Sequence, residues 1–99
     1  MKSFEQLKQI DSALEAETGL HFRQIPVFLK IKRKNGWRYL YSVKKGRIRT
    51  AWTVGGATVY NGVSDVLDQH IDFLNSKKVE FKIIVYSEPV DITKKYLNF

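Results

Sequence analysis

The sequence predicts an α+β fold in two layers, with the order helix, three antiparallel strands, helix, strand, and with both helices on one sheet face. Apolar residues recur at helical spacing near the N-terminus and again between residues 61 and 75. Residues 26–54 are strand-like and contain two turn signals. A chain of 99 residues, 43% of them hydrophobic, suits a single domain, residues 1–99, that buries one core.

Charge is distributed unevenly along the chain. Residues 18–64 contain ten Lys and Arg and no Asp or Glu, so all ten acidic residues lie in the flanking segments. Rows of basic residues with aromatic residues between them indicate a polyanion as a partner.

Composition excludes several kinds of site. The chain has no Cys, which excludes disulfides, thiolate nucleophiles and Cys-based zinc sites. The first residues have acids and an amphipathic period instead of the apolar run of a signal peptide, and no segment approaches 18 apolar residues. We therefore expect a cytoplasmic protein without a membrane partner.

A first helix is predicted to follow Ser3. Ser3 and Gln6 have the spacing of a capping box, in which each side chain accepts a hydrogen bond from a free backbone N–H of the other residue. Gly19 suits the left-handed position after the last turn, with Leu20 folding back onto the helix. The apolar stripe of this helix consists of Phe4, Leu7, Ile10 and Leu14.

The connection to the first strand contains His21 and Arg23. We interpret His21 as an ordinary loop residue, because neither a Cys nor a Ser with an acid accompanies it. Pro26 is expected to begin the strand, where its missing N–H does least harm.

The register of the first hairpin decides which side chains share a sheet face. A two-residue turn at Asn35–Gly36 would pair Ile31 with Leu40 and place the aromatic residues of the second strand on the face of the lysines. A three-residue loop over residues 34–36 pairs Ile31 with Tyr39 instead and gives every strand one apolar face. We predict this second register. The buried face then comprises Val27, Leu29, Ile31, Trp37, Tyr39, Tyr41, Val43, Ile48, Thr50, Trp52 and Val54.

The exposed sheet face and the two hairpin tips form the predicted binding site. Like charges on adjacent strands repel unless an anion neutralises them, which favours a bound polyanion. The alternative is an ordinary solvated face whose lysines protect a sheet edge. The predicted face residues are Lys30, Lys32, Arg38, Arg47 and Arg49, and the tips carry Lys34, Lys44 and Lys45.

Gly55 and Gly56 interrupt the strand pattern before the second helix. The Gly-Lys-Ser/Thr of a phosphate-binding loop and the spaced glycines of a dinucleotide fingerprint are both missing. We therefore interpret the two residues as turn or bulge glycines.

A second helix is predicted from a cap at Asn61 to about Asn75. His70 lies within its apolar stripe and is interpreted as a neutral, hydrogen-bonded core histidine. Asp68, His70 and Asp72 do not predict a metal site, because residues two apart on a helix point in different directions. The expected stripe consists of Val63, Val66, Leu67, His70, Ile71 and Leu74.

A last strand is predicted between Val79 and Tyr86. Its pattern alternates and then becomes apolar at residues 83–85, which is typical of a strand covered on both faces. We expect it to pair beside the first strand after a crossover. The tail after Pro89 carries enough apolar area, in Tyr96, Leu97 and Phe99, to dock on the domain.

The first five elements, over roughly residues 3–76, resemble a double-stranded-RNA-binding domain in order and size, which implies recognition of RNA by shape. Residues 61–65 depart from that family, because the chain is acidic where the family has a lysine cluster. HicA-type ribonuclease toxins resemble a shortened form of the same order. Their catalytic His has no counterpart here, where residues 34–36 take its place.

Residues 28–74 also resemble the arm-binding domain of phage integrases and the related plant-type domains in architecture and charge. Those domains insert an exposed three-stranded face with Arg, Lys and aromatic residues into the major groove, while a helix packs behind. The resemblance implies DNA contacts from Lys30, Lys32, Arg38, Arg47 and Arg49.

The leading hypothesis from the sequence is a small nucleic-acid-binding protein, with DNA expected over RNA and with Arg38 or Arg49 as base readers. The alternative is a protein-interaction module, an inhibitor or accessory factor of a phage or mobile element, that docks its basic face on an acidic protein. The edge of the third strand is a candidate for pairing with a second copy, as in a homodimer.

A ribonuclease that uses His21, Tyr39 and Tyr41 is a third hypothesis. It is less favoured, because no set of nucleophile, base and oxyanion donors can be assembled from the sequence. We therefore expect neither an enzymatic activity nor a cofactor.

Overall fold

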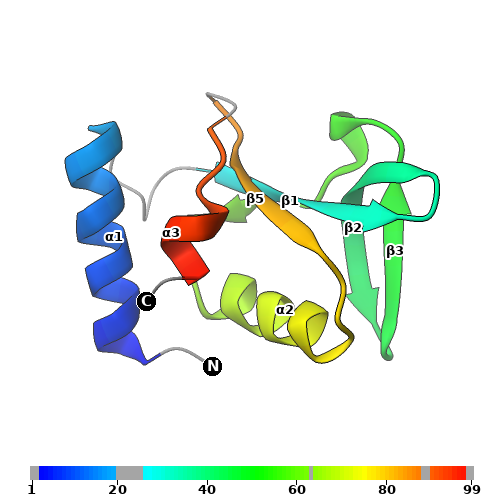
Figure 1. The fold of residues 1–99 in the computed structure, drawn as a ribbon, viewed down its shortest axis with the longest axis horizontal. Helices are drawn as coiled ribbons and strands as arrows, with labels where there is room; N and C mark the ends of the chain where they lie inside the picture. Colours follow the sequence, from blue (N-terminus) through cyan, green and yellow to red (C-terminus); the bar gives the residue numbers. More distant parts are fainter. Residues whose placement is uncertain (1–2, 20–25, 63, 88–89, 98–99) are drawn as a thin grey trace.

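The computed structural model describes residues 3–19, 26–62, 64–87 and 90–97, and it confirms the predicted α+β class and order of elements. Figure 1 shows α1 at one end of the molecule and the β2–β3 hairpin at the other, with α2 beneath β5. The structure adds a short strand and a short helix to the predicted elements. The helices are α1 (Phe4–Thr18), α2 (Asp65–Ser76) and α3 (Thr93–Leu97), and the strands are β1 (Pro26–Arg33), β2 (Gly36–Lys44), β3 (Arg47–Ala51), β4 (Tyr60–Asn61) and β5 (Phe81–Val85).

The central strand of the sheet is β1, which pairs with three other strands. On one edge, β5 runs antiparallel to it from Val27 to Ile31. The other edge is shared, because β4 pairs with Pro26 and Val27 whereas β2 pairs with residues 30–33. The expected pairing of the last strand with the first is confirmed.

The cap and the stop signal of α1 are confirmed. The backbone N–H of Ser3 donates to Gln6 Oε1 at 2.9 Å, and the N–H of Gln6 donates to Ser3 Oγ at 3.2 Å. Gly19 has a φ of 72° and donates its N–H to the carbonyl of Glu15 at 2.8 Å. The predictions for the Phe4 side chain and for Leu20, His21 and Arg23 fall outside the described residues.

One hydrophobic core lies between the sheet and the helices. Every second residue of β1 and of β5 points into it, which is the alternation expected of strands that face a helical layer. All three helices contribute to the same core, so they pack on one face of the sheet. The core residues are Leu7, Ile10, Leu14, Val27, Leu29, Ile31, Leu40, Tyr60, Leu67, Ile71, Leu74, Phe81, Ile83, Val85, Ile92 and Tyr96.

The predicted start of α2 is wrong. Ser64, and not Asn61, caps the helix, and its Oγ accepts a hydrogen bond from the N–H of Leu67 at 3.3 Å. Asn61 instead pairs with Pro26 as the last residue of β4. The predicted stripe was also too wide. The buried face of α2 is formed by Leu67, Ile71 and Leu74, at positions i, i+4 and i+7, and Val66 lies off this face and is 53% exposed. The prediction for Val63 falls outside the described residues.

The docking of the C-terminal segment is confirmed for Tyr96. Its hydroxyl donates to Asp68 Oδ1 at 2.8 Å, and both residues are buried. Burial, followed by the hydrogen bond and the charge of Asp68, raises the pKa of Tyr96 well above its usual range. Leu97 is exposed, and the prediction for Phe99 falls outside the described residues.

His70 is partly buried and hydrogen-bonded, as predicted. A hydrogen bond of 2.6 Å joins the Tyr60 hydroxyl and His70 Nδ1, and the two rings meet edge to face. Loss of solvent around the imidazole lowers the pKa of His70, which favours its neutral form.

The predicted register of the first hairpin is wrong. The turn consists of Lys34 and Asn35 alone, so that Ile31 lies opposite Arg38 and Lys30 lies opposite Tyr39. Compared with the predicted three-residue loop, this turn shifts β2 by one position. Because side chains alternate along a strand, a shift of one residue moves each of them to the other face.

A bulge between Leu40 and Ser42 then reverses the alternation of β2. Thr58 holds this bulge, because its N–H donates to the carbonyl of Leu40 at 2.9 Å and its hydroxyl donates to the carbonyl of Tyr41. As a result, Leu40 before the bulge and Val43 after it both face the core, although they lie three residues apart.

Candidate nucleic-acid interface

One face of the sheet, which we call the outer face, points away from the helical layer. Val27, Leu29 and Ile31 point into the core, so the residues between and after them point the opposite way. Residues directly opposite each other on neighbouring strands share a face, which extends the outer face across β5, β2 and β3. It comprises Phe28, Lys30, Lys32, Trp37, Tyr39, Ser42, Lys44, Arg47, Arg49, Ala51, Lys82 and Ile84.

The half of the outer face formed by β5, β1 and the first residues of β2 is aromatic, with the rings of Phe28, Trp37 and Tyr39, and we call it the aromatic half. The ring centroids of Phe28 and Tyr39 are 5.5 Å apart. Lys30 Nζ lies 5.6 Å from the centroid of the Tyr39 ring, and Lys82 Nζ lies 4.6 Å from that of Trp37. Both distances are within the range of a cation–π interaction. Trp37 and Tyr39 are therefore each accompanied by an ammonium group.

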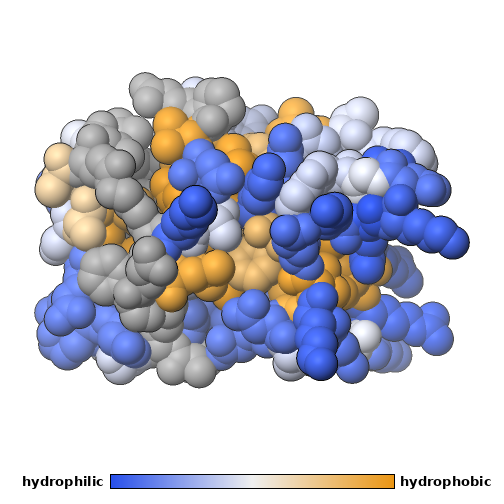
Figure 2. Space-filling view, in the orientation of Figure 1, coloured by the Kyte–Doolittle hydropathy of each residue, from blue (hydrophilic) through white to orange (hydrophobic). Residues whose placement is uncertain are grey.

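The half of the outer face at the β2–β3 hairpin is cationic, and we call it the cationic half. Lys44, Lys45, Arg47 and Arg49 are exposed and line a hollow of about 480 Å³. Lys45 and Gly46 both have positive φ, which makes the tight turn that holds Lys45 at the tip. No described acidic residue forms an ion pair with these four side chains. Figure 2 shows hydrophilic side chains projecting from this end of the molecule.

Like charges lie directly opposite each other in both halves of the outer face. Lys30 faces Lys82 across the β1–β5 pair, and Lys44 faces Arg47 across the β2–β3 pair. Like charges directly opposite each other destabilise a sheet. An anion placed between the two cations would remove this cost.

Glu80 supplies one opposite charge beside this face. Its Oε2 lies 3.4 Å from Lys32 Nζ, and both side chains are more than half exposed, at 64% and 58%. Exposed ion pairs contribute little to stability, so a competing anion displaces such a pair easily.

The structure brings most of the predicted site residues together. Lys30, Lys32, Arg47 and Arg49 lie on the outer face as predicted. Lys44 also lies on this face, because the bulge turns it outward. The predicted tip residues Lys34 and Lys45 lie at the two turns, at opposite ends of β2.

The predicted face of Arg38 is wrong. Arg38 lies opposite the core residue Ile31, and its guanidinium stacks on Trp52 with its carbon 3.6 Å from the ring centroid. Arg38 also donates a hydrogen bond from its side chain to the carbonyl of Trp37 at 2.9 Å. Trp52, predicted to be buried, is 78% exposed. The pair lies on the opposite side of the sheet from the cationic half.

Sequence reasoning missed the contributions of Lys82 and of the aromatic residues. Lys82 lies opposite Lys30 in the β1–β5 pair, and the expected pairing of these strands carried no register that could have placed it there. Trp37 and Tyr39 were predicted to be in the core because only the three-residue loop gave every strand one apolar face. The alternative with a two-residue turn would have placed them on the face of the lysines, as the observed turn does.

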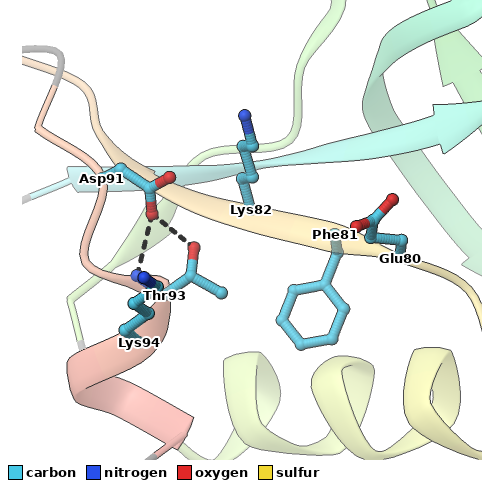
Figure 3. A pocket seen from close by; sticks show the side chains of 6 residues that line it. All are labelled: Glu80, Phe81, Lys82, Asp91, Thr93 and Lys94. Carbon is cyan, nitrogen blue, oxygen red and sulfur yellow. Dashed lines mark hydrogen bonds between the residues drawn. The ribbon is translucent and has the colours of Figure 1, made fainter.

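A second hollow, of about 540 Å³, lies between β5 and α3. In Figure 3, Phe81 points toward α2 whereas Lys82 points the opposite way. The carboxylate of Asp91 accepts hydrogen bonds from the N–H of Thr93 at 2.9 Å and from its hydroxyl at 2.5 Å. The Thr93 hydroxyl oxygen in turn accepts from the N–H of Ile83, so these polar groups serve the docking of α3.

Within the described ranges, no group of three or more His, Cys, Asp or Glu side chains is placed to hold a metal ion. The same residues include no helix that is both long and apolar enough to cross a membrane. Comparisons of the chain with protein-family models, with curated proteins and with solved structures give no match to any of them.

Proposed function

We propose that this protein binds nucleic acid through the outer face of its sheet. The observation that carries the proposal is the pairing of like charges on this face, where Lys30 faces Lys82 and Lys44 faces Arg47. A sheet that carries like charges on directly opposite residues gains free energy when a polyanion lies across them. A phosphate backbone supplies negative charges at regular spacing along such a surface.

The hollow of the cationic half fits this function. Four exposed cations converge there, and Lys and Arg are the side chains that contact phosphate oxygens most often in nucleic-acid complexes. Lys30, Lys32 and Lys82 extend the same charge over the aromatic half. An acidic protein remains the alternative partner, because complementary charge steers both kinds of encounter.

The test is fluorescence anisotropy of labelled duplex DNA, single-stranded DNA and RNA at two salt concentrations. With six phosphate contacts, the slope of log affinity against log salt should be about −4 for a single strand and about −5 for a duplex. Replacing Arg47 and Arg49 by Ala should weaken binding and reduce the slope by about 1.4 to 1.8, which is the contribution of two phosphate contacts.

The matched control removes the same charge elsewhere. Lys8→Gln with Lys77→Gln takes two cations from α1 and from the C-terminal end of α2, in the helical layer, and should leave most of the affinity intact. Equal loss in both double variants would show that binding reports net charge alone. Absence of binding to all three probes at low salt would refute the proposal and direct the search to an acidic protein.

A further inference from the structure

We infer that the outer face is selective for single-stranded nucleic acid, with unpaired bases stacked on Trp37 and Tyr39 and the backbone following the cations to the hollow of the cationic half. The inference rests on the proposed function and narrows its ligand to one strand, of DNA or of RNA. The two sources share the chemistry of a planar base and a phosphate, and the experiment below separates them.

The two rings on which bases would stack, Trp37 and Tyr39, are half-buried, and each has a lysine ammonium beside it. Lys82 Nζ lies over Trp37 at 4.6 Å, and Lys30 Nζ lies near Tyr39 at 5.6 Å. A lysine side chain is flexible and keeps its ammonium in contact with water. When a base takes the place of the ammonium over the ring, the ammonium remains close enough to meet the adjoining phosphate.

The platform is held in place before any ligand binds. Phe28 is buried although it points to the outer face, because Tyr39 packs at 5.5 Å and Tyr86 packs edge-on at 6.1 Å between ring centroids. A Tyr supported in this way loses little side-chain entropy when a base stacks on it. Stacking on such rings requires no particular base, since each base has a π-face.

The geometry favours a single strand over a duplex. In a duplex both faces of a base are covered by its neighbours in the stack, so rings lying on a sheet can stack only on bases that are unpaired. A duplex would use the cations of the outer face and leave its aromatic residues without a role.

The bulge of β2 joins the two kinds of contact in one path. Before the bulge the strand presents Trp37 and Tyr39 to the outer face, and after it the strand presents Ser42 and Lys44. Lys44 follows Tyr39 by five positions, which is at most about 17 Å along an extended strand. A short run of nucleotides can therefore place bases at one end and phosphates at the other.

The first experiment measures the affinity for single-stranded DNA, single-stranded RNA and duplex DNA of equal length, about 12 nucleotides, within the range bound by one small domain. We expect single-stranded DNA or single-stranded RNA to bind at least about tenfold more tightly than duplex DNA. Whichever single strand does so is the kind of nucleic acid that the outer face selects. Duplex affinity equal to or greater than that of both single strands would overturn the inference.

The second experiment uses the two tryptophans as reporters on opposite sides of the sheet. In Trp52→Phe the remaining indole is Trp37, and its fluorescence should be quenched when the single strand binds. In Trp37→Phe the remaining indole is Trp52, and its fluorescence should change little. Quenching of Trp52 with no change at Trp37 would place the ligand on the wrong face and overturn the inference.

The third experiment removes the rings. Trp37→Ala and Tyr39→Leu should each weaken single-strand binding by about five- to 150-fold, the range found for loss of one stacked base. Leu at position 39 keeps apolar cover over Phe28, and Trp52→Ala is the aromatic control that should bind normally.

The results separate the two proposals. If both ring variants bind like wild type while Arg47→Ala with Arg49→Ala still weakens binding, the face contacts phosphates only. The inference then fails and the proposed function remains. If no probe binds to the wild-type protein at low salt, the proposed function fails as well.

Discussion

Replacing Gly56 by Ala tests how closely the chain must approach β3 beside the bulge. Gly56 ends the 3₁₀ turn η2 (Val54–Gly56), and a Cβ added to it would lie 2.6 Å from the Cβ of Ala51. Carbon atoms attract at about 3.5–4.0 Å, so roughly 1 Å of separation is missing. The Cβ of Ala51 has no torsion that could move it aside. Only a shift of the backbone relieves the contact.

We expect Gly56→Ala to lower the free energy of unfolding by about 1–3 kcal/mol, the usual cost of overpacking. For a domain of this size, each kcal/mol lowers Tm by about 4–8 °C. The neighbouring glycine is the matched control. A Cβ on Gly55 would meet nothing closer than Thr53 Oγ1 at 3.9 Å, so Gly55→Ala should be neutral or stabilise by about 0.4–1 kcal/mol.

Urea denaturation of a double-mutant cycle identifies the contact that causes the loss. Removing the opposing methyl group with Ala51→Gly should rescue part of the defect of Gly56→Ala, with a coupling energy of at least about 1 kcal/mol. A Gly56→Ala protein as stable as Gly55→Ala, or strict additivity of the two substitutions, would refute the argument from close approach.

Three further predictions concern single side chains of the fold. Burial lowers the pKa of His70 below its ordinary value of 6.5, so near that pH the unfolded state binds more protons than the folded state. The free energy of unfolding should therefore fall as the pH drops through 6.5 toward the folded-state pKa. Urea midpoints measured across this pH range should vary less for His70→Gln than for the wild-type protein. Tyr96→Phe removes one hydrogen bond to the buried Asp68 and should lower the free energy of unfolding by about 1–3 kcal/mol. In the control Tyr86→Phe, the hydroxyl belongs to a half-exposed side chain, and stability should change by less than about 0.5 kcal/mol. Equal effects of the two substitutions would contradict the role of the buried hydrogen bond. Ser3→Ala should cost about 0.5–2 kcal/mol through loss of the α1 cap, and an unchanged Tm would show that α1 does not depend on it.

Local signals were sufficient for the ends of α1 and for the order of the predicted elements. Ser3, Gln6 and Gly19 act on backbone groups within four residues of themselves, so the ends of α1 follow from the sequence. The start of α2 did not follow, since both Asn61 and Ser64 can cap a helix. The choice between them depends on the pairing of Asn61 with Pro26 in β4, a contact between distant parts of the chain.

The faces of β2 could not be predicted for the same reason. A pattern of alternating side chains assumes that alternation is uninterrupted, and here it changes at the bulge between Leu40 and Ser42. Thr58 holds that bulge from 17 residues beyond Tyr41. Trp37 and Tyr39 precede the bulge and face outward because the first turn is one residue shorter than predicted, whereas Val43 and Ile48, beyond the bulge, pack against the core.

The charges of the site were easier to predict than its rings. Basic residues rarely enter a core, so most of them reach a surface in either register. Large aromatic residues are found both in cores and at binding surfaces, and only the three-dimensional register assigned Trp37 and Tyr39 to the outer face.

The facing pairs Lys30–Lys82 and Lys44–Arg47 also give ionic strength two opposite effects on this protein. Added salt screens the repulsion within each pair, which should make the free protein harder to unfold. The same salt weakens the attraction of these cations for a phosphate backbone. The salt concentrations that most stabilise the ligand-free protein are thus those at which its affinity for the ligand is lowest. The free and bound forms should therefore reach their highest melting temperatures at different salt concentrations.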